Sequence, residues 1–139
     1  MTSHDYTFRV GYPDTDQMGT IHHARYPVFY EVARWEFFRA MGIPYSSIEA
    51  AGVLMPVIRM SFHFLQTAHY DDKLTLRTTI KAFKGVRIWF AYELFNETGR
   101  VINRAETELA FVQKADWKPC SPPAFVTDVL KQCLAQEGE

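Results

Sequence analysis

Cysteine is scarce in this sequence, and its scarcity narrows the kinds of protein the chain can be. The 139 residues contain two cysteines, Cys120 and Cys133. Their spacing is not that of a zinc site, and two thiols are too few for the disulfide framework of a small secreted protein. We therefore expect ordinary thiols of a reducing compartment, and no metal site.

Long apolar runs and an excess of one charge are also lacking. No segment approaches the ~18 consecutive apolar residues of a membrane span, and the opening MTSHDYTFRV lacks the apolar stretch of a signal peptide. Fifteen basic and sixteen acidic residues give a net charge of −1, which provides no broad field for binding nucleic acid. We expect a cytoplasmic protein with no membrane span and no nucleic-acid partner. A local basic patch for a phosphorylated ligand remains compatible with this charge.

Aromatic residues, by contrast, are plentiful. The chain has eleven Phe, seven Tyr and three Trp, a composition that suits a fold with a large sheet surface to cover. Its length is that of one ordinary domain and is sufficient to bury a core without disulfides. We therefore expect a single domain over residues 1–139.

The first part of the chain predicts a strand and then a long helix. Residues 6–12 are β-prone, and after a loop the helix should begin between His23 and Pro27 and end at about Met41. Proline is tolerated in a first helical turn, and Gly42 is well placed to end the helix. Because its charged residues are few and scattered among apolar ones, the helix should be largely enclosed.

Apolar and polar side chains alternate in four later segments. The segments span residues 58–65, 74–82, 86–94 and 104–111. This two-residue period is typical of antiparallel strands covered on one face. The turns between them contain glycine or charged residues, at 70–73, 84–85 and 97–100.

This order of elements predicts an α+β fold. A strongly twisted sheet curled around one helix fits it, and so does a sandwich with helices packed on one face of a sheet. Residues 122–136 predict a short terminal helix.

Proton-transferring groups are concentrated just before the long helix, in YPDTDQMGTIHHARY (residues 12–26). The first N–H groups of a helix have no partners within it, and the helix dipole is positive there. Asp16 lies a few residues upstream, and its carboxylate can fold back over this end to take up a proton or attack a bound carbonyl. Gly19 would let the loop turn sharply or let a ligand approach the backbone. The pattern predicts a reaction site at the helix start.

The same residues also have simpler interpretations. Asp14 and Asp16 could each cap a turn or the helix, and we interpret Asp14 as structural. The adjacent His22 and His23 point in different directions on a helix start and have no third ligand at suitable spacing, which argues against a metal site. Tyr12 could be only an aromatic residue at a strand end.

The opening stretch, followed by VFYEVARWEFFRAMGI, resembles the start of the hot-dog-fold acyl-CoA thioesterases. It is most similar to the 4-hydroxybenzoyl-CoA thioesterase-like branch, and within it to the enzymes associated with the Tol–Pal system. The later VLMPVIRMSFHFLQTAHYDDKLTLRTTI resembles the second and third strands of that family. The family motif is matched by Asp14, Thr15, Asp16, Gly19, His23 and Tyr26. Two departures are Arg25, where the family often has Asn, and Pro27 directly after the tyrosine.

The resemblance implies a curved five-stranded antiparallel sheet wrapped around a long central helix. It also implies hydrolysis of a small or medium acyl-CoA, aliphatic or aromatic, to the free acid and coenzyme A without a further cofactor. Asp16 would be the general base or the nucleophile, and the backbone N–H of His23 would bind the thioester carbonyl. The His23 side chain and Tyr12 would help to position substrate or water, and Gly19 and Tyr26 would contact substrate.

Assembly and phosphate binding follow from the same resemblance. A homodimer or homotetramer is implied, with sites at the subunit interface. The phosphates of coenzyme A favour basic partners, and the candidates of suitable chemical type are Arg59, Lys84, Arg87, Lys114 and Lys118. We select the first three as substrate-binding residues. The alternative is that each is simply a charged side chain exposed to solvent.

Two other functions compete with hydrolysis. An enoyl-CoA hydratase also pairs an acid with a histidine, but the hydratases of this fold have a different motif from the one in this sequence. A non-catalytic acyl-CoA-binding protein, or an interaction scaffold near the cell envelope, would keep the fold and need no catalytic carboxylate.

Overall fold

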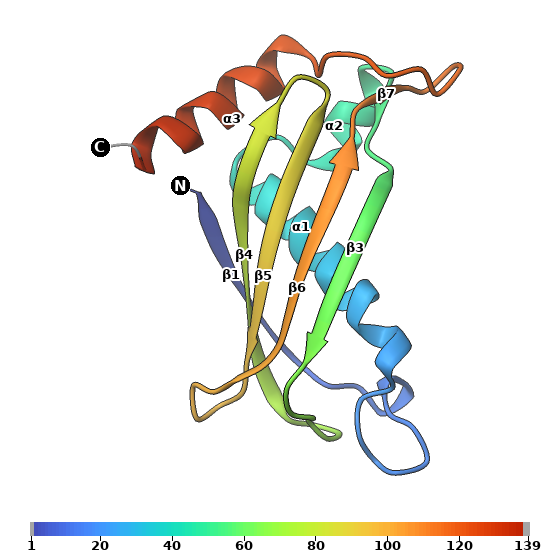
Figure 1. Ribbon diagram of the computed structural model, residues 1–139, viewed down its shortest axis with the longest axis vertical. Helices are drawn as coiled ribbons and strands as arrows, with labels where there is room; N and C mark the ends of the chain where they lie inside the picture. Colours follow the sequence, from blue (N-terminus) through green and yellow to red (C-terminus); the bar gives the residue numbers. More distant parts are fainter. Residues whose placement is uncertain (1, 138–139) are drawn as a thin grey trace.

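A long helix, α1 (Tyr26–Ala40), lies against one face of a twisted antiparallel sheet in the computed structural model, which describes residues 2–137 (Figure 1). The sheet has five strands in the order β1-β4-β5-β6-β3. They are β1 (Ser3–Arg9), β3 (Val57–Phe64), β4 (Lys73–Lys84), β5 (Arg87–Phe95) and β6 (Val101–Ala110). The order of elements alone left two α+β architectures open. The curved five-stranded antiparallel sheet around a long helix, which the family resemblance implied, is confirmed.

Several short elements complete the chain. They are the 3-10 turns η1 (Tyr12–Asp14) and η2 (His23–Arg25), the helices α2 (Tyr45–Ala50) and α3 (Ala124–Glu137), and the paired strands β2 (Val53–Leu54) and β7 (Val112–Gln113). The predicted terminal helix is confirmed as α3. Helix α2 and the β2–β7 pair were not predicted, because elements this short leave no clear period in the sequence.

The first strand begins and ends earlier than predicted. β1 pairs with β4 from Ser3 to Arg9, where Arg9 lies opposite Lys73, the first residue of β4. Beyond that point β4 offers no partner, so the ladder stops and the chain turns. Tyr12 therefore belongs to the turn η1 and not to the end of a strand.

The alternating pattern correctly identifies the buried face of the sheet. Inward-facing side chains of the two central strands are at most 2% exposed, namely Leu74, Leu76, Thr78, Ile80, Ile88, Phe90, Tyr92 and Leu94. They pack against Phe29, Ala33, Phe37 and Phe38 of α1. Burying each large apolar side chain contributes about 1.5–3 kcal/mol, so this interface supplies most of the stabilisation of the fold.

The helix is enclosed on one side only, which corrects the expectation of nearly complete burial. Val28 and Trp35 are exposed on the side of α1 away from the sheet. Arg34, in contrast, turns into the core, where its Nη1 donates to the Tyr92 hydroxyl at 2.9 Å. Burial raises the pKa of Tyr92, so this hydroxyl stays protonated and in turn lies 2.7 Å from Thr107 Oγ1.

The end of α1 is confirmed where the sequence predicted it. Gly42 has φ +82, a left-handed conformation that glycine adopts without a Cβ penalty. Its N–H donates to Arg39 O at 3.0 Å, and the N–H of Ile43 donates to Phe38 O at 3.0 Å. These two bonds satisfy the last carbonyls of the helix in a Schellman motif.

Replacing Gly42 with Ala should lower the free energy of unfolding by about 1–2 kcal/mol, because a Cβ is strained at this φ. A loss of this size corresponds to a fall of about 3–6 °C in Tm, measured by thermal denaturation. Gly42→Asn should lose less, since asparagine tolerates the left-handed region. Equal stability of the Ala variant and the parent would contradict the assigned cap.

Candidate active site at the start of helix α1

The loop between β1 and α1 is fastened to the rest of the molecule at both of its ends. Near its end, Ile21 N donates to Ala68 O at 3.0 Å, and both residues are buried. Short bridges pair Thr15 with Ile21 and Thr20 with His69. The loop, at the end of the molecule opposite α3 in Figure 1, therefore has a defined conformation beside the helix start.

Asp14 ties this loop to the helix, in agreement with a structural role. Its Oδ1 accepts from Arg25 Nε at 2.8 Å and lies 2.7 Å from Arg25 Nη2, and its Oδ2 accepts from Gly11 N at 2.9 Å. The backbone carbonyl of Asp14 also accepts from His22 N at 2.9 Å. Arg25, which departs from the family pattern, thus holds the loop against the helix start.

Asp16 is partly buried, and its two carboxylate oxygens have different surroundings. Oδ1 accepts from Met18 N at 2.9 Å and from Thr20 N at 3.3 Å. The closest described partner of Oδ2 is Thr20 Oγ1, at 3.4 Å. One oxygen therefore holds the turn, as the simpler interpretation proposed, while the other is nearly free to meet a substrate or water.

Gly19 makes this turn possible. Its φ is +79, and its N–H donates to Asp16 O at 3.0 Å. A Cβ at this position would meet no heavy atom within 4 Å, so the requirement for glycine lies in the backbone angle and not in crowding. The predicted sharp turn is confirmed.

The start of the helix carries a backbone donor without an acceptor. Around it, His22 N donates to Asp14 O and Ala24 N donates to His22 Nδ1 at 3.0 Å. No acceptor is found for the N–H of His23 anywhere in the described chain. His23 opens η2, which leads directly into α1, and neither η2 nor the first turn of α1 contains an acidic residue. The positive end is therefore not neutralised by the helical segment itself. Such an end favours an oxygen that acquires negative charge.

The side chains of His22, His23 and Tyr12, near this donor in the sequence, are all exposed. The two imidazole rings stack 4.5 Å apart, and both residues are exposed. His22 is occupied as a cap for Ala24. Tyr12 is 74% exposed and meets Tyr70 edge-on at 5.6 Å. Pro27 lies in the first turn of α1, where its missing N–H is tolerated.

Tyr26 begins α1 and is only 2% exposed. It meets Phe64, at the end of β3, edge-on at 5.3 Å. Burial raises the pKa of Tyr26, while a side-chain hydrogen bond with Thr67 acts in the opposite direction. An open hollow of about 280 Å³ lies here, lined by Ile21, Tyr26, Phe64, Leu65, Gln66 and Thr67.

Phe64 and Leu65 were not recognised as candidate site residues from the sequence. Their alternation indicates only that they belong to a strand. It does not indicate that this strand is at the sheet edge or that it ends beside the helix start.

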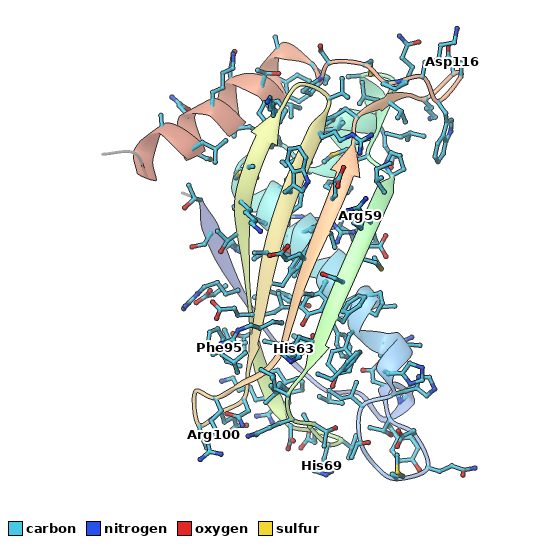
Figure 2. All side chains as sticks on the ribbon, viewed as in Figure 1. Arg59, His63, His69, Phe95, Arg100 and Asp116 are labelled. Carbon is cyan, nitrogen blue, oxygen red and sulfur yellow. The ribbon has the colours of Figure 1, made fainter. Side chains whose placement is uncertain are left out.

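The basic residues selected from the sequence lie elsewhere within one chain. Arg59 is near the beginning of β3, and Lys84 and Arg87 flank the β4–β5 turn, at the end of the strands away from the start of α1 (Figures 1 and 2). Arg87 pairs with Glu108 and holds the pKa of that carboxyl below its usual range. A single chain therefore does not bring these three residues to Asp16.

Two absences concern residues 2–137. No group of three or more histidine, cysteine, aspartate or glutamate side chains could hold a metal ion in this part of the chain. No helix within it has the length and apolarity needed to cross a membrane.

Known proteins provide an independent comparison. Residues 10–130 match the Thioesterase-like superfamily. The sequence is 33% identical over 110 residues to the putative acyl-CoA thioesterase YneP of Bacillus subtilis, covering 79% of this chain and 80% of that protein. It is 32% identical over 124 residues to the acyl-CoA thioester hydrolase YbgC of Escherichia coli, covering 89% and 92%.

Solved structures agree with the fold. A DHNA-CoA thioesterase from Staphylococcus aureus superposes with a TM-score of 0.93 at 26% identity, covering 100% of this chain and 97% of that one. A 4-hydroxybenzoyl CoA thioesterase mutant complexed with 4-hydroxybenzoyl CoA superposes with a TM-score of 0.83 at 21% identity, covering 96% and 99%. Since the family match spans most of the sequence and the hot-dog fold is shared, this chain belongs to the thioesterase-like superfamily.

Proposed function

We propose that this protein hydrolyses acyl-CoA thioesters to a free acid and coenzyme A at the start of α1. The observation that carries the proposal is the N–H of His23, which has no acceptor among the described residues and opens a helical segment without acidic residues in its first turns. The carboxylate of Asp16 is fixed in the preceding turn. The names of the relatives, acyl-CoA thioesterase and thioester hydrolase, support the same reaction.

In the proposed reaction, the N–H of His23 and the carboxylate of Asp16 act on opposite sides of the thioester. The carbonyl oxygen accepts from His23 N–H and gains negative charge as the carbonyl carbon is attacked. One well-placed donor of this kind contributes about 3–4 kcal/mol to the transition state. Asp16 either removes a proton from the attacking water or attacks the carbon itself, in which case water then hydrolyses the intermediate. In both routes the carbon–sulfur bond breaks, and the thiolate of coenzyme A takes up a proton.

The acyl group would occupy the hollow beside Tyr26. The rings of Tyr26 and Phe64 form an apolar wall, and the volume of about 280 Å³ suits a small or medium acyl group, aliphatic or aromatic. The coenzyme is part of the substrate, and the reaction needs no further cofactor. We place the protein in the cytoplasm, because the unpaired Cys120 and Cys133 fit a reducing compartment.

A second copy of the chain would complete this hollow. The two edge strands of the sheet differ: the exposed residues of β1 are polar, whereas β3 exposes Val57, Ile58, Met60 and Phe64. An apolar, unpaired edge strand favours pairing with another strand, and two-fold pairing joins the same strand of two copies. We therefore propose a homodimer through β3, with the exposed side of α1 covered next to it. Such dimers could pack further into a tetramer.

The catalytic role is tested with Asp16→Asn, which is nearly isosteric and retains an oxygen to hold the turn. Turnover of acyl-CoA, followed by release of free thiol, should fall at least about 100-fold with Tm unchanged, because the amide can neither take up the proton nor attack. Asp128→Asn, an exposed substitution on α3, is the matched control and should retain full turnover.

Two results would contradict this function. Retained activity in the Asp16→Asn variant would favour a binding protein or a different catalytic group. Hydration of crotonyl-CoA without thiol release would instead favour an enoyl-CoA hydratase.

The dimer is tested with Ile58→Lys, which places a charge on the β3 edge where the parent side chain is 48% exposed. Light scattering should give a multiple of 16.1 kDa for the parent and 16.1 kDa for the variant. Thr7→Lys, on the opposite edge strand β1, should leave the assembly intact. A parent protein that is monomeric at micromolar concentration would rule out this interface.

A further inference from the structure

The loop that follows β7 carries an exposed tryptophan in a strained conformation. Trp117 has φ +61 and is 59% exposed. The backbone N–H of Trp117 donates to Gln113 O at 2.8 Å, and the backbone N–H of Gln113 donates to Lys118 O at 2.8 Å. These two bonds close the loop and give it a defined conformation. A bulky residue is unfavourable in the left-handed region, and such strain is concentrated at ligand-binding positions.

Folding gives no reason for a tryptophan at this position. The indole is not part of any aromatic pair with another described residue, and most of its surface faces solvent. Glycine or asparagine would form the same turn with less strain. The large flat side chain is therefore available for contact with something outside the chain.

Two lysines belong to the same short loop as Trp117. Lys114 and Lys118 are both exposed, and neither ammonium group forms an ion pair within residues 2–137. The nearby Asp116 carboxylate accepts from Lys118 N at 2.9 Å, which stabilises the turn. Lys114 also lines an open hollow of about 650 Å³ beside Gly52 and Pro123. An exposed aromatic face next to unpaired cations matches a purine base that carries phosphates.

The position of this loop relative to the site decides what it can bind. Within one chain it lies at the beginning of β3, whereas the start of α1 lies at the end of that strand (Figure 1). The eight residues of β3 span about 26 Å. In Figure 2, Asp116 at the tip of the loop lies past the beginning of β3, on the outer side of this edge strand. The proposed second copy would pair on this side.

Pairing of β3 with β3 of a second copy would bring the Trp117 loop of one chain close to the start of α1 of the other. In an antiparallel pair, the beginning of one strand lies beside the end of the other. Within each chain, Phe64 at the end of β3 contacts Tyr26 at the start of α1. The end of β3 in the partner chain therefore lies beside the start of α1 of that chain. The tip of the loop then approaches the active site of the other subunit.

We propose that Trp117, Lys114 and Lys118 bind the adenine nucleotide end of the coenzyme A thioester whose acyl end is hydrolysed in the partner subunit. Trp117 stacks on the adenine, and the two ammonium groups contact the phosphates. This inference rests on the proposed function and on the proposed dimer. It makes each active site depend on both chains.

The substrate itself provides the sharpest test, because an acyl-pantetheine lacks the nucleotide. Trp117→Gly removes the ring and relieves the backbone strain, so folding should be preserved. Its KM for acyl-CoA should rise about 5- to 30-fold with kcat unchanged, since a stacked base is commonly worth this much. Its KM for the matching acyl-pantetheine should not change, and Trp117→Phe should restore most of the affinity. Phe125→Ala, another exposed aromatic residue at this end of the molecule, is the matched control.

Binding without turnover gives a second readout. Adenosine 3′,5′-bisphosphate should quench tryptophan fluorescence in the parent and not in the Trp117→Phe variant. Lys114→Ala and Lys118→Ala should each weaken its binding several-fold, whereas Lys131→Ala, on the exposed side of α3, should not.

Three outcomes separate the possible failures. An equal rise in KM for both substrates, or an unchanged KM for acyl-CoA, would overturn the nucleotide site. Dissociation of the dimer by Trp117→Gly would also overturn it and would show that the ring packs against the partner chain. Absence of thiol release by the parent protein would refute the proposed function, and the fluorescence titration would still decide whether the loop binds the nucleotide.

Discussion

The positive end of helix α1 is the constraint on which the proposed site depends. Because the apolar face of the helix is buried against the central strands, its N-terminus is held in one position, and the unpaired N–H of His23 is held with it. No acidic residue in the first turn neutralises this end. The same packing that stabilises the fold therefore also orients the donor that the reaction requires.

The loop before the helix carries two aspartates with different contacts. Asp14 pairs with Arg25 and fixes the loop, whereas Asp16 uses mainly one oxygen to hold its turn. The two aspartates of one short motif thus have separate tasks. Asp16 holds the turn, as the simpler interpretation predicted, and its second oxygen is nearly free, as the proposed catalytic role requires.

Local features were predictable from the sequence, and long-range placement was not. Residue alternation identified the four later strands, and Pro27 and Gly42 marked the two ends of the helix. The end of β1 was misplaced because it depends on where β4 begins. Similarly, periodicity does not reveal that β3 pairs with β6 and becomes an apolar edge.

The candidate site divides in the same way. Asp16, Gly19 and His23 belong to one contiguous motif, and the structure places Asp16 and Gly19 in the turn that precedes the helix start. The wall formed by Phe64 comes from a different part of the chain. The proposed role of the basic residues requires a second chain, because Arg59 and the Trp117 loop lie at the end of β3 away from the start of α1. Residues contributed across an interface leave no local pattern that a single sequence can reveal.

A crystal structure of the Asp16→Asn variant with an intact acyl-CoA tests the central claim most directly. The account predicts that the thioester carbonyl oxygen lies about 2.7–3.2 Å from the backbone nitrogen of His23. The side chain of residue 16 should then face the opposite side of the carbonyl carbon. A thioester bound with its carbonyl oxygen away from the helix start would contradict the account.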